Sequence, residues 1–109
     1  MWAAEIERIH QTAIKRSGMA PWSQEDIRFL SLALAGEVGE LGNFVKKEWR
    51  GDFRTLDQRQ SYQKAVMKEL ADIRVYLHLL ATAFHVDLDE AVEEKLPEIR
   101  KKFPTGETK

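Results

Sequence analysis

The sequence predicts an all-α fold made of four helices. Apolar residues recur at helical spacing in four segments, and no stretch alternates apolar and polar residues for long enough to form a strand. The two central segments each exceed about twenty residues and are joined by a short connection, which favours a long antiparallel hairpin in a helix bundle. With 109 residues, the chain is expected to form a single domain over residues 1–109.

The first helix is predicted by apolar residues at helical spacing, namely Trp2, Ile6, Ile9 and Ala13. It is expected to end at Ser17 and Gly18. Ser23, with Asp26 three residues later, resembles a capping box and starts a second helix that runs to about Glu48. The WRGDFRT stretch after it contains a Gly-Asp break.

Two apolar stripes are expected to be buried along the central helices. The stripe of the second helix consists of Ile27, Leu30, Leu34, Val38, Leu41 and Val45. The third helix is expected from about residue 57 to about residue 85, and its stripe consists of Val66, Leu70, Ile73, Leu77 and Leu80.

The last helix is expected to begin at a second capping-box pattern, Asp87 with Glu90. Pro97 lies inside this segment and lacks a backbone donor, so it should kink or restart the helix. The final stretch PTGETK, residues 104–109, is expected to be a frayed, flexible tail.

Composition excludes several classes of protein. The formal net charge is -1, with 17 basic and 18 acidic residues, so no overall field favours nucleic acid or an anionic membrane as a partner. The absence of cysteine excludes disulfide scaffolds and thiolate chemistry. The stretch MWAAEIERIHQ has no basic or apolar region typical of a secretion signal, and no apolar run is long enough for a membrane span. We therefore expect a soluble, cytoplasmic protein.

Two acid pairs are the pattern most typical of a chemical site. Glu37 and Glu40 are three residues apart on the apolar stripe of the second helix, and Glu69 and Asp72 repeat this spacing on the third. In an antiparallel hairpin the four carboxylates would face and repel one another unless a cation compensated their charge. The pattern therefore predicts a divalent metal site, although a lone pair of this kind usually lies on a solvated helix face.

The type of ligand favours a particular metal. An all-oxygen set suits Mg²⁺ or Mn²⁺, and no histidine follows Glu69 at the spacing that di-iron helix bundles use. Mg²⁺ bound in this way usually also contacts the phosphates of a substrate. Gly36 and Gly39, beside the acids, are expected to leave room for ions, water or a close helix.

The stretches GEVGEL and KELADIRVYL, with VDLDEAVEEKL after them, resemble the MazG-like all-α NTP pyrophosphohydrolase family, and most closely its dCTP pyrophosphatase branch. The family pattern is E-x-x-E on one helix and E-x-x-D on the next, and the resemblance covers about residues 23–104. It implies a four-helix MazG-like bundle that forms a homodimer or homotetramer. Gly36 replaces a glutamate that many MazG-like proteins have, a change that the dCTP pyrophosphatase branch shares. Lys47 and Ile99 depart from the branch, which has a base-stacking aromatic residue and usually an asparagine there.

The resemblance also implies an activity, the Mg²⁺-dependent hydrolysis of a (d)NTP to the (d)NMP and pyrophosphate, with Mn²⁺ able to substitute. House-cleaning of dCTP or of related, modified pyrimidine deoxynucleotides is the expected role. The implied metal ligands are Glu37, Glu40, Glu69 and Asp72. We expect Glu40 to be the catalytic residue that orients or deprotonates the attacking water.

Aromatic residues are candidates for binding the base. Tyr76 matches a tyrosine of the family's nucleotide pocket, and Trp22 and Trp49 lie near two further aromatic positions. Each has an alternative role: Trp22 as a hydrophobic staple, Trp49 at a subunit interface and Tyr76 in the core. The three histidines lack partner spacing and are assigned to surface or packing positions, namely His10, His78 and His85.

Basic residues of the last helix are candidates for binding the outer phosphates. Lys95 matches a family lysine near the phosphates, and Arg100 and Lys102 follow it. Alternatively, the KKF stretch is a solvated helix end whose cations suit the helix dipole.

Two other functions compete with the leading hypothesis. The same fold could act on dUTP or phosphoribosyl-ATP, which related all-α families hydrolyse. A non-catalytic helical oligomerisation module, whose acids only bind ions, would bind metal without turnover.

Overall fold

The computed structural model describes residues 1–106 and confirms an all-helical fold with four helices. The helices are α1 (Trp2–Arg16), α2 (Gln24–Trp49), α3 (Leu56–Ala83) and α4 (Leu88–Lys102). No strand occurs among residues 1–106. Of the predicted tail, residues 104–106 lie outside the helices, and residues 107–109 lie outside the described part of the chain.

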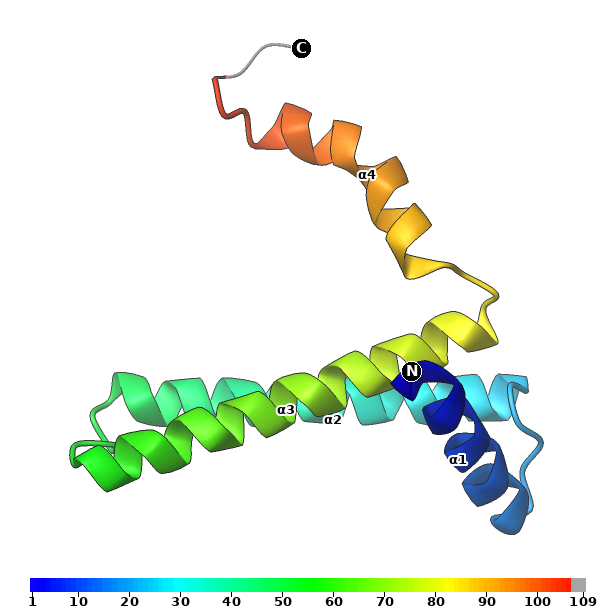
Figure 1. Cartoon of the computed structure of the whole chain (residues 1–109), viewed down its shortest axis with the longest axis horizontal. Coiled ribbons are helices and arrows are strands. Elements are labelled where there is room, and N and C mark those ends of the chain that lie inside the picture. Colours follow the sequence, from blue (N-terminus) through cyan, green and yellow to red (C-terminus); the bar gives the residue numbers. More distant parts are fainter. Residues whose placement is uncertain (107–109) are drawn as a thin grey trace.

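Three of the helices pack together, and the fourth extends away from them. The long helices α2 and α3 lie side by side and are joined at one end by residues 50–55, while α1 crosses the other end (Figure 1). α4 projects from the end of α3 and contains no buried residue. Within one chain the predicted bundle is therefore incomplete, because α4 does not join the other three helices.

Local side-chain caps explain where the helices begin. Ser23 accepts a hydrogen bond from the Asp26 N–H over 3.3 Å, and Asp87 accepts one from the Glu90 N–H over 3.1 Å, so both predicted N-caps are present. A full capping box is present at the start of α3. The Thr55 side chain accepts a hydrogen bond from the Gln58 N–H, and the Gln58 side chain accepts one from the Thr55 N–H. This T-x-x-Q pattern was present in the sequence but was not recognised.

The ends of the last two helices differ in part from expectation. α3 ends at Ala83, close to the predicted position, and His85 follows in a left-handed conformation with φ 57°. α4 continues through Pro97 to Lys102 as one helix, so the proline does not restart it.

The core lies where α1 crosses α2 and α3. Leu30, Leu79 and Ala83 are buried there, and partly buried side chains pack around them, namely Ile6, Trp22, Ile27, Val75, Tyr76 and Leu80. The contacts of α1 with the longer helices explain why the core is confined to this end of the molecule.

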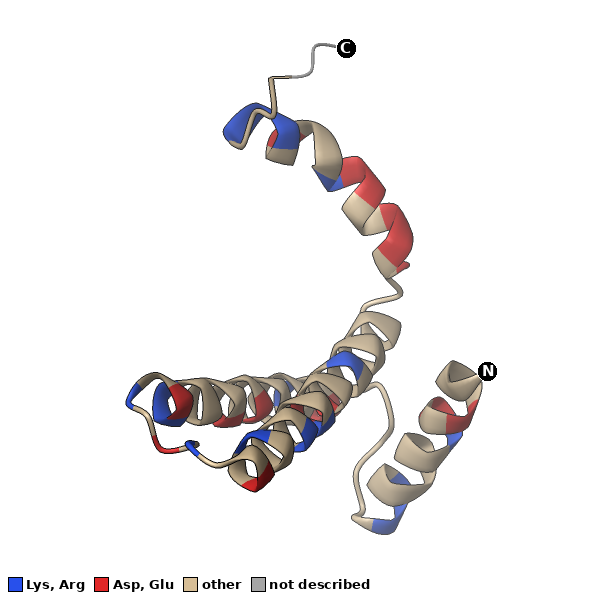
Figure 2. Ribbon diagram, turned by 60° about the vertical axis from the view of Figure 1, so that its left-hand side comes forward, with Lys and Arg blue, Asp and Glu red and all other residues tan. Residues whose placement is uncertain are grey.

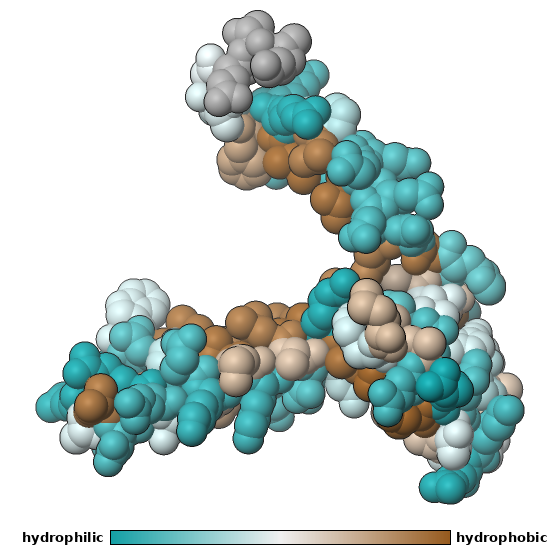
Figure 3. Space-filling model, viewed as in Figure 1, coloured by the Kyte–Doolittle hydropathy of each residue, from teal (hydrophilic) through white to brown (hydrophobic). Residues whose placement is uncertain are grey.

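Much of the two apolar stripes is exposed, contrary to the prediction. Val38, Val45, Leu70 and Leu77 are exposed by 50%, 45%, 52% and 37%. Apolar residues form a band along the paired helices, on the side from which α4 projects (Figure 3). Two helices that contact each other can cover only part of each stripe, and here no third helix covers the remainder. Among residues 1–106, no helix combines the length and the apolar character needed to span a membrane.

Candidate functional site

Three of the predicted acids meet where α2 lies against α3. Glu37 and Glu40 project from α2, and Glu69 projects from α3. Each offers a carboxylate oxygen, and these oxygens all lie within 4.8 Å of one another. Residues three apart lie on neighbouring parts of one helix face, which explains how α2 directs two acids toward α3.

Within residues 1–106, no ion pair compensates the charge of the three acids. The Glu37 and Glu69 Oε2 atoms are buried and have no hydrogen-bond partner. The pKa of Glu69 is raised from 4.5 to about 7, first by the hydrogen bond that it shares with Glu37, then by burial and by Glu40. Carboxylates only accept hydrogen bonds, so contact between two of them requires either a proton or a cation. Buried oxygens without partners in an all-oxygen cluster fit a hard divalent cation such as Mg²⁺ or Mn²⁺.

Asp72, the fourth predicted ligand, is not part of this cluster. Its side chain is exposed, and its carboxylate is not among the oxygens that lie within 4.8 Å of one another. Three residues along a helix correspond to a rotation of about 300°, so Asp72 lies on the same side as Glu69 but about one turn further on. Its role as a metal ligand stays a prediction.

A small pocket adjoins the acids. It has a volume of ≈ 330 Å³ and is lined by Glu40, Asn43, Phe44, Lys47 and Glu69. The Lys47 Nζ atom lies 5.7 Å from the centre of the Phe44 ring. Asn43, Phe44 and Lys47 were not among the predicted site residues, although their spacing of three, four and seven residues from Glu40 places them on its face of α2.

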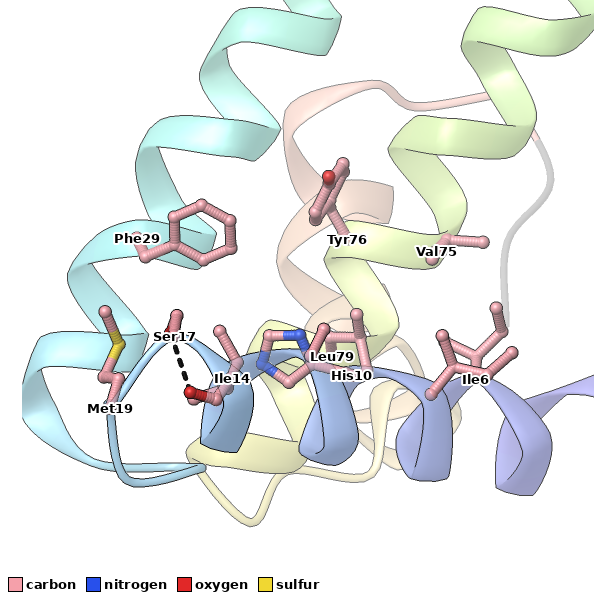
Figure 4. Close-up of a pocket in the computed structure, with 11 residues that line it drawn as sticks. Ile6, His10, Ile14, Ser17, Met19, Phe29, Val75, Tyr76 and Leu79 are labelled. Atoms are coloured by element: carbon pink, nitrogen blue, oxygen red, sulfur yellow. Dashed lines mark hydrogen bonds between the residues drawn. The ribbon is translucent and has the colours of Figure 1, made fainter.

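A larger apolar cavity lies between α1, α2 and α3. It has a volume of ≈ 490 Å³, and Tyr76, Phe29 and His10 contribute to its wall (Figure 4). Tyr76 follows Glu69 by seven residues on α3, or about 10 Å along the helix axis at 1.5 Å per residue. The predicted pocket tyrosine thus lines a cavity that lies further along the helix from the acid cluster.

The two tryptophans proposed for base binding occupy different environments. Trp22 is half-buried, packs against the core and lies beside His10, with 5.2 Å between the ring centroids. Its backbone is left-handed, with φ 64°. Trp49 is 86% exposed at the end of α2 and lines neither of the two cavities described above.

The basic candidates on α4 lie away from the acids within one chain. Most acidic residues of α4 lie toward its start, and most of its basic residues lie in its last turn (Figure 2). Lys95 forms an ion pair with Glu98, and the Lys102 Nζ atom lies 5.7 Å from the centre of the Phe103 ring. Because α4 extends away from α2 and α3, the chain does not bring Lys95, Arg100 or Lys102 to Glu40.

Two of the histidines that were assigned to surface or packing positions also pair with carboxylates, which their spacing did not predict. The His10 Nε2 atom lies 2.9 Å from each carboxylate oxygen of Asp26, and Asp26 is fully buried. The His78 Nε2 atom lies 2.8 Å from Glu7 Oε2. Both pairs join α1 to another helix, and the separations of 16 and 71 residues explain why local spacing did not reveal them.

The fold and the cluster define an all-helical protein with a carboxylate-rich candidate metal site. Over 104 residues, 92% of this chain, it is 36% identical to rat dCTP pyrophosphatase 1 and 38% identical to the bovine protein of the same name. The human dCTP pyrophosphatase 1 is 36% identical over the same length. These similarities support the predicted resemblance to the dCTP pyrophosphatase branch. The chain spans 58% of the length of these relatives, and no family model matches it.

Proposed function

We propose that the chain is a Mg²⁺-dependent nucleoside triphosphate pyrophosphohydrolase that acts on dCTP or on related, modified pyrimidine deoxynucleotides. The observation that carries this proposal is the cluster of Glu37, Glu40 and Glu69, which has buried oxygens without partners. The similarity to proteins named dCTP pyrophosphatase 1 supports the choice of substrate.

The reaction is hydrolysis at the α-phosphorus. Glu37, Glu40 and Glu69 would hold the metal, and Asp72 lies one turn away as a further ligand. Bound Mg²⁺ would neutralise negative charge on the phosphates and would lower the pKa of a water molecule that it holds. Glu40 lines the adjoining pocket and takes a proton from the attacking water. The water oxygen bonds to the α-phosphorus, the bond from that phosphorus to the β-bridging oxygen breaks, and pyrophosphate leaves.

The apolar cavity is suited to the base. It is mostly apolar with a few polar groups, as nucleotide-base pockets generally are. Its tyrosine, Tyr76, lies about 10 Å along α3 from Glu69, a separation that a nucleoside triphosphate can bridge. Stacking on Tyr76 or Phe29 would orient the base.

We further propose that the protein works as a homodimer or homotetramer. α4 has no buried residue, and apolar side chains remain exposed along α2 and α3. A second copy that covered this surface could bring Lys95, Arg100 and Lys102 of one chain to the phosphates at the acids of the other.

Experiments can distinguish the proposed function from the two competing functions that the sequence analysis left open. Substrate profiling separates dCTP from dUTP and phosphoribosyl-ATP. The exposed apolar band favours the non-catalytic oligomerisation module as a second candidate, and that module would bind Mg²⁺ without releasing pyrophosphate.

The deciding experiment measures pyrophosphate release from a panel of canonical and modified NTPs and dNTPs, with Mg²⁺ and with EDTA. We expect Mg²⁺-dependent release of pyrophosphate and the monophosphate, with a rate for Glu40→Gln that is about a hundredfold or more lower, since a general base contributes about 10²–10⁴-fold. Glu48→Gln makes the same change two turns further along α2, outside the cluster, and should keep the wild-type rate. Folded wild-type protein with no turnover of any nucleotide would rule out the proposed reaction.

A further inference from the structure

Asp26 is a buried carboxylate with no part in the proposed hydrolysis. Its side chain has no exposed surface, although it lies in the first turn of α2. Three hydrogen-bond contacts reach its carboxylate: two from His10 Nε2 at 2.9 Å and one from the Trp22 N–H at 2.8 Å. The positive end of the helix dipole also favours a negative charge at this position.

The hydrogen bonds of Asp26 hold one residue of the cavity wall and the turn that precedes α2. One is the His10 ring of α1, and the other is the backbone of Trp22, which adopts the left-handed conformation with φ 64°. Non-glycine residues adopt this conformation only when their surroundings hold them there. Asp26 therefore fixes both the His10 ring and the turn that precedes α2.

The geometry places a hydrogen on the Nε2 atom of His10. An ionised carboxylate accepts hydrogen bonds and cannot donate them, so the Nε2 atom between the two Asp26 oxygens must be the donor. In a neutral ring, Nδ1 is then an acceptor. Among residues 1–106, no hydrogen-bond partner is seen for His10 Nδ1.

His10 also lines the apolar cavity, where polar groups are few. The Ser17 hydroxyl lines the same cavity but donates to the Ile14 carbonyl over 2.7 Å, so its hydrogen is already used (Figure 4). The His10 ring and the Tyr76 hydroxyl are then the side-chain groups best placed to read the polar edge of a base.

We propose that Asp26 is a positioning residue that selects the base: it holds His10 with hydrogen on Nε2, so that Nδ1 accepts a hydrogen bond from a base with an exocyclic amino group. This inference rests on the proposed function of the cavity as the base site. A pyrimidine with an amino group, such as cytosine, satisfies Nδ1. A keto pyrimidine such as uracil presents an oxygen there and leaves two acceptors facing each other.

The test compares dCTP with dUTP for the wild type and for Asp26→Asn. The amide is nearly isosteric, so its oxygen can still accept from the Trp22 N–H, while its NH₂ group replaces one of the two acceptors at His10 Nε2. We expect a larger share of the ring with hydrogen on Nδ1, seen in its ¹⁵N NMR shifts. The ratio of kcat/KM for dCTP to that for dUTP should fall by about ten- to a hundredfold, which corresponds to the cost of one unsatisfied buried polar group.

The matched control is Glu7→Gln. It changes the other carboxylate that pairs with a histidine between α1 and another helix, but Glu7 and His78 lie outside the apolar cavity. We expect the wild-type base ratio in this variant. A changed tautomer with an unchanged base ratio in Asp26→Asn, or no change of tautomer at all, would overturn the proposal, as would an equal loss of base selectivity in Glu7→Gln.

A measurement on the wild type covers the case in which Asp26→Asn does not fold. The ¹⁵N shift of His10 Nδ1 is followed while dCMP or dUMP is added. We expect dCMP to move the Nδ1 resonance and dUMP to leave it in place. Binding with the same response to both, or binding of dCMP without any response, would exclude the proposed contact. Failure of the proposed function is recognised separately, as absence of dCTP hydrolysis in the wild type.

Discussion

Glu69 makes stability depend on pH at the scale of a single residue. Its pKa is raised from 4.5 to about 7 in the folded protein, so between these pH values the folded state holds a proton that the unfolded state has lost. The contribution of Glu69 to stability is therefore greatest below pH 4.5 and is lost as the pH rises to about 7. We expect Mg²⁺ to restore stability above this range, because it replaces the proton.

Glu69→Gln provides the test of this dependence. The amide resembles the protonated acid and cannot ionise, so the metal-free variant should melt at a higher temperature than the wild type at pH 8 and at a similar temperature at pH 5. Thermal melting in EDTA across this range measures the difference, and added Mg²⁺ should stabilise the wild type more than the variant. Glu48→Gln, on the exposed part of α2, should follow the wild-type curve. A variant curve that parallels the wild type at every pH would contradict this account.

Residues whose positions depend on a single helix could be predicted, and those that pair across the fold could not. Glu37 and Glu40 were found because three-residue spacing fixes their common face. Glu69 was found because the same spacing recurs on the adjacent helix. The pairing of His10 with Asp26 depends on how α1 folds back after residues 17–23, and no local pattern encodes that contact.

At the scale of secondary-structure elements, the start of α3 depends on the Thr55 capping box. Thr55→Ala removes the acceptor for the Gln58 N–H, and we expect it to lower the free energy of unfolding by about 0.5–2 kcal/mol. Chemical denaturation measures this loss. Thr55→Ser keeps a hydroxyl at the N-cap and should retain most of the stability, so an equal loss in both variants would show that the cap is not responsible.

Elements were predictable wherever their signals were local. The starts of α2 and α4 followed from Ser23 and Asp87, and the helical period gave the type of every element. Pro97 was expected to kink or restart the last helix, and it does not restart it, since a proline removes only one backbone hydrogen bond and the remainder of α4 can continue around it. Periodicity also identified the apolar faces without showing what covers them.

At the scale of the whole molecule, the exposed apolar band along α2 and α3 indicates a surface that one chain does not cover. Val38, Val45 and Leu70 belong to stripes that the sequence predicted as buried, yet all are about half exposed in one chain. The fold of one chain leaves α4 without a buried face as well. Association with a second copy would bury both surfaces, which is how a short helical chain gains the core that it cannot form alone.

We expect Val45→Glu to separate the copies of the proposed assembly. A charge placed on the band would have to be buried without a partner in the assembly, which costs several kcal/mol, whereas in a lone chain it remains in water. We expect the wild type to sediment as a dimer or tetramer and the variant to shift toward the monomer by analytical ultracentrifugation. Leu32→Glu places the same charge on a side chain of α2 that lies outside the predicted stripe and is 75% exposed, and it should leave the assembly intact. In the proposed assembly the basic residues of α4 serve the acids of another copy, so Val45→Glu should also reduce pyrophosphate release even though it changes no predicted ligand. A monomeric wild type would contradict this prediction and would mean that Lys95, Arg100 and Lys102 do not serve the phosphates in the way proposed.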